Sequence, residues 1–147
     1  MKIALASDHR GFEFKSKIGK FVSDLGHEVI DYGTSNETVS VDYTDYGLEA
    51  ARSVSRGESD RAVLICGTGL GMSLIANKVK GVRATVCHDL HTVEMSRRHN
   101  DANVLCLGAD VVDQGLLEKK IKLWLETQFE GGRHARRVGK IMEAEGA

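Results

Sequence analysis

Five short apolar runs recur along the chain, and a polar or glycine-rich turn follows each of them. The runs are rich in residue types suited to β-strands. They are continuously apolar and not alternating, which is typical of strands in a sheet covered on both faces. The predicted strands are residues 3–6, 28–32, 62–66, 84–87 and 104–107.

Between these runs, apolar residues recur at spacings of three or four, which is the period of a helix face. The three clearest faces are Phe14, Ile18, Phe21 and Leu25; Tyr46, Ala50 and Val54; and Leu116, Ile121, Trp124 and Leu125. Alternating strands and helices predict an α/β sandwich around a five-stranded parallel sheet with right-handed crossovers. The chain shows no linker or internal repeat, so residues 1–147 are predicted to form one domain.

The last part of the chain predicts a separate helix. Gly131 and Gly132 break the preceding helix, which is expected to end near Phe129, and residues 133–145 continue as a charged helix with Val138, Ile141 and Met142 on one side. A short helix of this kind is marginal alone and needs a surface to pack on. We expect a neighbouring subunit to supply that surface.

The composition excludes several classes of protein. The 20 basic and 21 acidic residues give a net charge of −1, whereas a nucleic-acid binder needs a positive surplus. The longest strictly apolar run, residues 62–66, falls far short of the ~20 residues that span a bilayer. Asp8 and Arg10 end the first apolar run too early for an export signal. We therefore expect a cytoplasmic protein with neither a nucleic-acid nor a membrane partner, and its three cysteines, an odd number, favour reduced thiols.

The strongest local motif is the run from Cys66 to Ser73, in which three alternating glycines follow a buried strand and open a helix. Ligands of open parallel sheets bind beyond the carboxyl ends of the strands. Backbone N–H groups of such a turn can converge on an anion. A dinucleotide fingerprint would need glycine where Met72 stands, and the Walker lysine is missing. The loop is thus predicted to cradle an anion or oxyanion of another kind, the alternative being a tight turn without a ligand.

Four further groups of side chains are candidates for chemistry. Cys66 at a helix N-terminus favours a thiolate that acts as nucleophile or base, although cysteine is more often a small buried hydrophobe. His99 is a candidate acid or base, or else a surface residue at a helix end. Arg133 and Arg137 are four apart, so they suit a phosphate or form a solvated basic face. Asp8 and His9 after the first strand stay open, and His88, Asp89 and His91 stay unassigned, with no metal site predicted.

Taken together, these segments resemble the type B ribose-5-phosphate isomerase family, which also contains the galactose-6-phosphate isomerase subunits. The resemblance extends over essentially the whole chain, and the runs that carry it are residues 7–12, 41–43, 66–71, 76–78, 96–97, 99–103 and 131–134. The resemblance implies a Rossmann-like, three-layer α/β/α sandwich. It also implies homodimers or tetramers whose sites are built from two subunits, with no metal or organic cofactor.

The resemblance also implies a role for each matching residue. Cys66 would be the base that moves a proton between adjacent carbons, and His99 would assist opening of the sugar ring. A third group would stabilise the enediolate oxygen: Gly67, Thr68, Gly69, Leu70 and Gly71. Asp8, Tyr43 and Asn100 would position sugar hydroxyls. His9, Arg133 and Arg137 would hold the phosphate.

One position departs from the family pattern. Members often carry a phosphate-binding arginine where this chain has Asp110. An anion beside a phosphate weakens binding unless Arg136 or another residue compensates. We expect interconversion of ribose 5-phosphate and ribulose 5-phosphate through an enediolate, in the pentose phosphate pathway. The alternatives are another substrate (galactose 6-phosphate, allose 6-phosphate or a shorter sugar phosphate) or a non-catalytic sugar-phosphate binding module.

Overall fold

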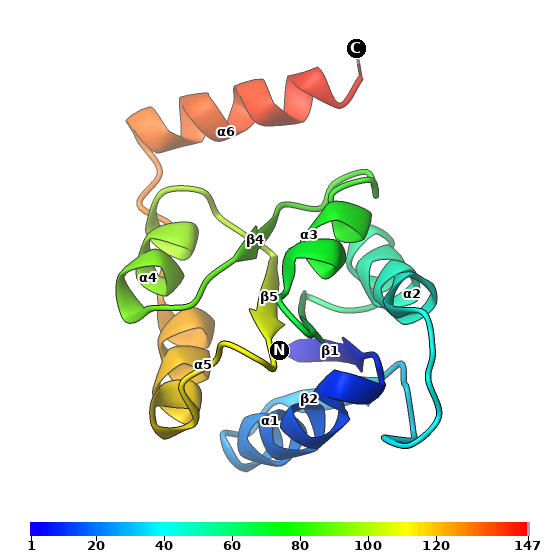
Figure 1. Cartoon of the computed structure of the whole chain (residues 1–147). Coiled ribbons are helices and arrows are strands. Elements are labelled where there is room, and N and C mark those ends of the chain that lie inside the picture. Colours follow the sequence, from blue (N-terminus) through cyan, green and yellow to red (C-terminus); the bar gives the residue numbers. More distant parts are fainter. Residues whose placement is uncertain (147) are drawn as a thin grey trace.

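The computed structural model describes residues 1–146, and at its centre lies a five-stranded sheet between two layers of helices (Figure 1). The strands are β1 (Lys2–Ser7), β2 (Glu28–Asp31), β3 (Arg61–Cys66), β4 (Ala84–Val86) and β5 (Val104–Gly108). Their order is β2-β1-β3-β5-β4, and each neighbouring pair is parallel. All five predicted strands are confirmed, each to within one residue at either end.

Helices cover both faces of the sheet. One layer contains α1 (Phe12–Asp24), α4 (Leu90–Arg98) and α5 (Leu117–Glu126), and the other contains α2 (Tyr43–Ser55) and α3 (Leu70–Ala76). Short 3₁₀ turns at His9–Gly11 and Gln114–Leu116 precede α1 and α5. The sheet with helices on either side confirms the predicted three-layer sandwich.

The two faces of the sheet are packed with side chains of different size. On β1, Ile3 and Leu5 face α1 and α5, whereas Ala4 and Ala6 face α2 and α3. Each fully buried leucine or isoleucine contributes about 1.5–3 kcal/mol to stability. Successive residues of a strand point to opposite faces, so Cys66, the last residue of β3, lies on the α2–α3 side.

Helix α5 ends at Glu126, so the prediction that it reaches Phe129 was wrong. Thr127 already has extended backbone (ψ 127°), and its hydroxyl donates to the carbonyl of Leu123 at 2.5 Å. Threonine hydroxyls often make such local bonds near helix ends. The chain then passes α4, where the Glu130 N–H donates to the Arg98 carbonyl at 3.0 Å.

Helix α6 (Arg133–Ala144) runs along the outside of the molecule and is joined to the rest by residues 127–132 (Figure 1). It bridges a hollow of about 170 Å³, whose lining includes Val82, Asn100 and Ile141. Ile141 is 51% exposed although it belongs to the apolar side of the helix. Within residues 1–146, no helix has both the length and the apolar character needed to cross a membrane.

Candidate active site

Cys66 lies at the carboxyl edge of the sheet, with its sulfur turned into the loop that follows. The Gly69 N–H donates to Cys66 Sγ at 3.2 Å, and Cys66 is 5% exposed. Gly69 has φ +81°, a left-handed conformation that glycine adopts at little cost, and this turn brings its N–H back over the sulfur. A backbone donor aimed at a sulfur stabilises negative charge there. We call residues 66–71 the Cys66 loop.

The Cys66 loop is packed closely against its neighbours. The ring of Tyr43 lies directly against Gly71, where no Cβ fits. A Cβ on Gly108 would lie 2.6 Å from the carbonyl carbon of Thr68. The exposed Thr68 hydroxyl accepts the Leu70 N–H at 3.3 Å. The fold therefore fixes the loop, while the Thr68 side chain stays open to solvent.

Asp8 and His9 lie on the neighbouring strand end and shape the turn after β1. The Asp8 Oδ1 accepts the N–H groups of Arg10 and Gly11 at 3.0 and 3.1 Å. The His9 Nδ1 accepts the Val41 N–H at 3.2 Å and so holds the segment that leads into α2. Both predicted site residues therefore also have a structural role at this edge.

A second polar group lies where α4 ends, before β5. The rings of His99 and His134 are stacked, with centroids 4.0 Å apart and planes at 9°. Glu130 lies beside both rings, 3.7 Å from His99 Nε2 and 3.9 Å from His134 Nε2. Its Oε2 also accepts from Arg98 Nε at 2.8 Å. We call His99, Glu130 and His134 the amino-edge cluster.

Burial lowers the pKa of His134, and the electrostatic effects of His99 and Arg133 lower it further, while Glu130 acts in the opposite direction. A neutral imidazole beside His99 is therefore favoured. Arg133 and Arg137 lie exposed on the first two turns of α6, near this cluster.

Two histidines and a carboxylate are ligand types that transition metals accept. The three donor atoms lie within 4.8 Å of one another. However, the stacked rings point their lone pairs in parallel and not toward one point, and Arg98 already binds the carboxylate. The arrangement therefore fits stacking and hydrogen bonding better than metal coordination.

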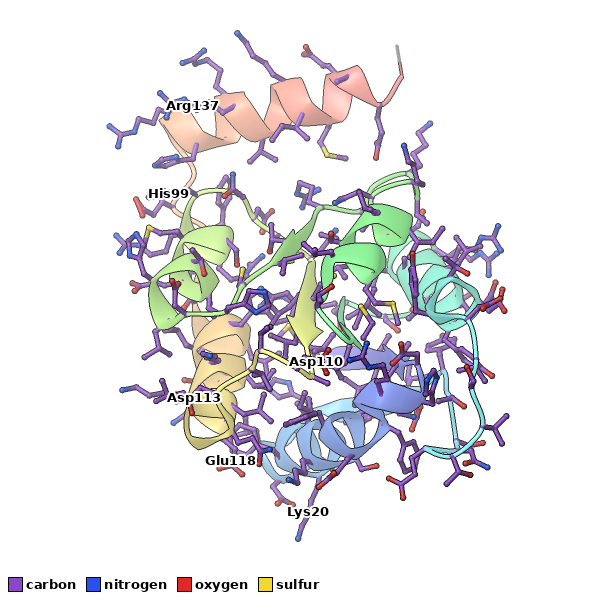
Figure 2. All side chains as sticks on the ribbon, viewed as in Figure 1. Lys20, His99, Asp110, Asp113, Glu118 and Arg137 are labelled. Carbon is purple, nitrogen blue, oxygen red and sulfur yellow. The ribbon has the colours of Figure 1, made fainter. Side chains whose placement is uncertain are left out.

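The Cys66 loop and the amino-edge cluster lie at opposite edges of the sheet. Gly108 at the end of β5 pairs with Cys66, whereas His99 comes before β5 begins. Five residues of strand separate these edges by roughly 16 Å. Figure 2 shows His99 and Arg137 near α6, well away from Asp110, which contacts Gly67 of the loop. Within one chain, the predicted residues of the Cys66 loop therefore lie apart from the predicted residues His99, Arg133 and Arg137.

Comparison with known proteins shows the family of this chain. The profile of the family described as Ribose/Galactose Isomerase matches residues 3–141. The chain belongs to this family. The solved structure of Clostridium thermocellum ribose-5-phosphate isomerase B superposes on this isomerase with a TM-score of 0.96 at 52% identity, covering 99% of this chain and 98% of the other.

Two curated relatives of the isomerase carry different names. Ribose-5-phosphate isomerase B of Escherichia coli is 46% identical over 98% of this chain and 96% of the relative. The D-erythrulose-4-phosphate isomerase of Pectobacterium atrosepticum is 36% identical over 96% of this chain and 93% of the relative.

Three residues of the isomerase's polar edges were missed by sequence reasoning. Glu130 gave no signal of its own, and His134 lies in the matching run 131–134 without a predicted role, because their partner His99 is more than 30 residues away and only the fold brings them together. Arg10 was expected only to end the first apolar run, yet it forms an ion pair with Asp110. The sequence left open whether Arg136 or another residue compensates for Asp110, and in the structure Asp110 pairs with Arg10.

Proposed function

We propose that this isomerase interconverts D-ribose 5-phosphate and D-ribulose 5-phosphate through a cis-enediolate, as a cytoplasmic step of the pentose phosphate pathway, with Cys66 as the base. The observation that carries the proposal is the Cys66 sulfur facing its own loop, with the Gly69 N–H on it. A base in this position is held beside amide donors, which is what proton transfer next to a carbonyl requires.

The reaction is a transfer of hydrogen between two neighbouring carbons of the open-chain sugar. The Cys66 thiolate takes the proton from C2, and the electron pair of that bond forms the C1–C2 double bond while the carbonyl electrons move to O1. The O2 hydroxyl gives its proton to O1. The Cys66 thiol then protonates C1 as the C2 carbonyl forms, which regenerates the thiolate.

The Cys66 loop supplies the stabilisation for the charged intermediate. The negative charge develops on oxygen, and the loop amides together with the Thr68 hydroxyl are the donors that face it. A single donor of this kind contributes roughly 3–4 kcal/mol of transition-state stabilisation. Asp8 and Tyr43 position sugar hydroxyls at the same edge, and His9 holds the phosphate.

The remaining functional residues come from a second copy of the chain. His99 would assist ring opening, Asn100 would bind a hydroxyl, and Arg133 and Arg137 would bind the phosphate. All four lie on the amino-edge side of the sheet, and the length of β5 separates that edge from the Cys66 edge by roughly 16 Å. The hollow beneath α6 and the exposed Ile141 support a partner at this surface. The active unit is therefore a homodimer, or a tetramer of such pairs.

A second candidate substrate is another sugar phosphate, such as galactose 6-phosphate, allose 6-phosphate or a shorter one. Two observations favour it. Asp110 stands where a phosphate-binding arginine is expected, and the Pectobacterium relative is named for a four-carbon sugar phosphate.

The test is to incubate the protein with a panel of aldose phosphates in D₂O and to follow ketose formation and C2 deuterium exchange by NMR. We expect D-ribose 5-phosphate to give the largest kcat/KM. Cys66→Ala should lower exchange by about 10²–10⁴-fold, the contribution of a positioned base. Cys87→Ala, a change at another buried cysteine, is the matched control and should retain activity.

Two results would contradict the proposal. If no aldose phosphate yields a ketose, the assigned reaction is wrong. If Cys66→Ala exchanges C2 hydrogen as fast as the unmodified chain, the reaction stands but Cys66 is not its base.

A further inference from the structure

An ion pair crosses the mouth of the Cys66 loop. Arg10 Nη2 donates to Asp110 Oδ2, and the two residues come from the ends of β1 and β5, on either side of β3. Both side chains lie on Gly67: a Cβ at that position would be 2.5 Å from Arg10 Nη1 and 3.2 Å from Asp110 Oδ2. The pair therefore lies one residue from the proposed base.

The backbone on both sides of the pair is fixed. The Arg10 N–H donates to the Asp8 carboxylate at 3.0 Å. The Asp110 N–H donates to the Gly67 carbonyl at 2.9 Å, and the preceding Ala109 N–H donates to the Cys66 carbonyl at 2.8 Å. The position of the Arg10 guanidinium thus depends chiefly on its own side-chain torsions and on its bond to Asp110.

The Arg10 guanidinium keeps unused binding capacity. Within residues 1–146, Asp110 is the acceptor of its only side-chain hydrogen bond, although an arginine carries five N–H donors. The side chains of Arg10 and Asp110 are 53% and 44% exposed. An ion pair this exposed contributes little to stability, with a usual range of about 0–1 kcal/mol. Its location therefore points to binding and not to folding.

We infer that Arg10 is a substrate-binding cation of this isomerase, which contacts the phosphate of the sugar, and that Asp110 holds Arg10 over Gly67 while competing with the phosphate for it. The inference rests on the proposed function and adds a specificity-determining residue to it. A guanidinium binds phosphate through several charge-assisted hydrogen bonds. The Asp110 carboxylate repels the same anion, so removing either member of the pair should change affinity in opposite directions.

The test measures dissociation constants by titration calorimetry with two probes. Inorganic phosphate is titrated into chains with Cys66 intact, and D-ribose 5-phosphate into the same chains carrying Cys66→Ala, so that turnover does not interfere. We expect Arg10→Ala to raise both constants about tenfold and Asp110→Asn to lower both about threefold. Arg52→Ala, which breaks the similarly exposed Arg52–Glu49 pair on α2, should leave both unchanged.

Whether Asp110→Asn strengthens or weakens phosphate binding distinguishes a pair that controls substrate binding from one that only supports the loop. If both variants weaken binding, the pair only supports the loop, and the inference is wrong. It is equally wrong if neither variant changes affinity, if inorganic phosphate binds none of the chains, or if affinity for the sugar phosphate changes while affinity for inorganic phosphate does not. Arg10→Met, which keeps the length without the charge, repeats the test if Arg10→Ala does not fold.

These measurements are independent of the reaction. If the unmodified chain fails to exchange C2 hydrogen in any aldose phosphate, the proposed function fails, while the phosphate titrations still show whether Arg10 binds the anion.

Discussion

The two polar edges of this sheet are built in different ways. At the carboxyl edge, the Cys66 loop is held by backbone geometry, with Gly69 turned over the sulfur and Gly71 pressed against Tyr43. At the amino edge, the members of the cluster around His99 contact one another through side chains, by ring stacking and through the Glu130 carboxylate, and one backbone bond from the Glu130 N–H to the Arg98 carbonyl joins the cluster to α4. Backbone-fixed groups are preorganised within one chain, whereas side-chain clusters adapt to what packs on them.

In the proposed two-chain site, this difference shows which half is already formed within a single chain. The Cys66 loop has its shape already. The amino-edge cluster includes His134 of α6, so in the proposed dimer its final geometry depends on how the partner packs against α6.

The largest expected effect comes from mixing two defective chains. Cys66→Ala and His99→Asn should each lower kcat by about 10²–10⁴-fold. In the proposed dimer, each site takes Cys66 from one copy and His99 from the other. When the two variants are unfolded and refolded together, each mixed dimer therefore has one site with both substitutions and a second site with neither. Equal mixing should then restore about a quarter of the unmodified activity, by the two-fold symmetry of the pair.

The control for mixing is a pair of chains with the same edge altered, Cys66→Ala and Cys66→Ser, which should restore nothing. A solution mass measurement of each sample establishes the oligomeric state. If the first mixture remains as inactive as its parents while dimers are present, then Cys66 and His99 do not act in a site shared between copies.

A smaller effect is expected from crowding the preorganised edge. In Gly71→Ala the new methyl group overlaps the Tyr43 ring, so the loop must shift. Overpacking of this kind costs about 1–3 kcal/mol of stability. Displacing reacting groups by about 1 Å costs up to ~10²-fold in rate, so kcat/KM should fall about 10- to 100-fold. Gly146→Ala, where the nearest atom would be 3.7 Å away, is the control; an unchanged kcat/KM for Gly71→Ala would mean that the loop is not rigid.

The smallest effect concerns pH and the amino edge. Burial lowers the pKa of His134 in the folded chain below 6.5, its ordinary value in the unfolded chain. In the window between the folded and the unfolded pKa, the histidine is therefore protonated in the unfolded chain and neutral in the folded chain. The free energy of unfolding should therefore decrease as the pH falls from 6.5 through that window. His134→Gln should make this decrease smaller, as measured by urea unfolding at equal protein concentration at about pH 7.5, 6.5 and 5.5.

His27, whose pKa is also lowered chiefly by burial, contributes a slope of the same sign to both chains, so the difference between them isolates His134. Identical slopes for the two chains would show that His134 titrates as it does in the unfolded state.

Four strands (β1, β3, β4 and β5) were predictable because each is a short, largely apolar run bounded by glycine or polar residues. The edge strand β2 has a charged residue at either end and only Val29 and Ile30 between them. The Cys66 loop was predictable for the same local reason, since its glycines are adjacent in sequence. The end of α5 was not, because Arg61 of β3 donates to the Trp124 and Leu125 carbonyls at 2.9 and 3.3 Å, and these are the acceptors that the next residues of a longer helix would need. The Arg10–Asp110 pair joins residues 100 apart, and no local pattern reports on such a contact.

The length of β5 has a consequence for how this protein tolerates change. Leu105 and Leu107 face one helical layer and Cys106 the other, so a residue inserted in the strand would exchange the faces of all that follow. The same insertion would lengthen by about 3.3 Å the span between Gly108 and the residues near His99. Insertions and deletions are therefore expected to accumulate in exposed segments such as residues 35–40, whereas the five-residue length of β5 is expected to stay constant.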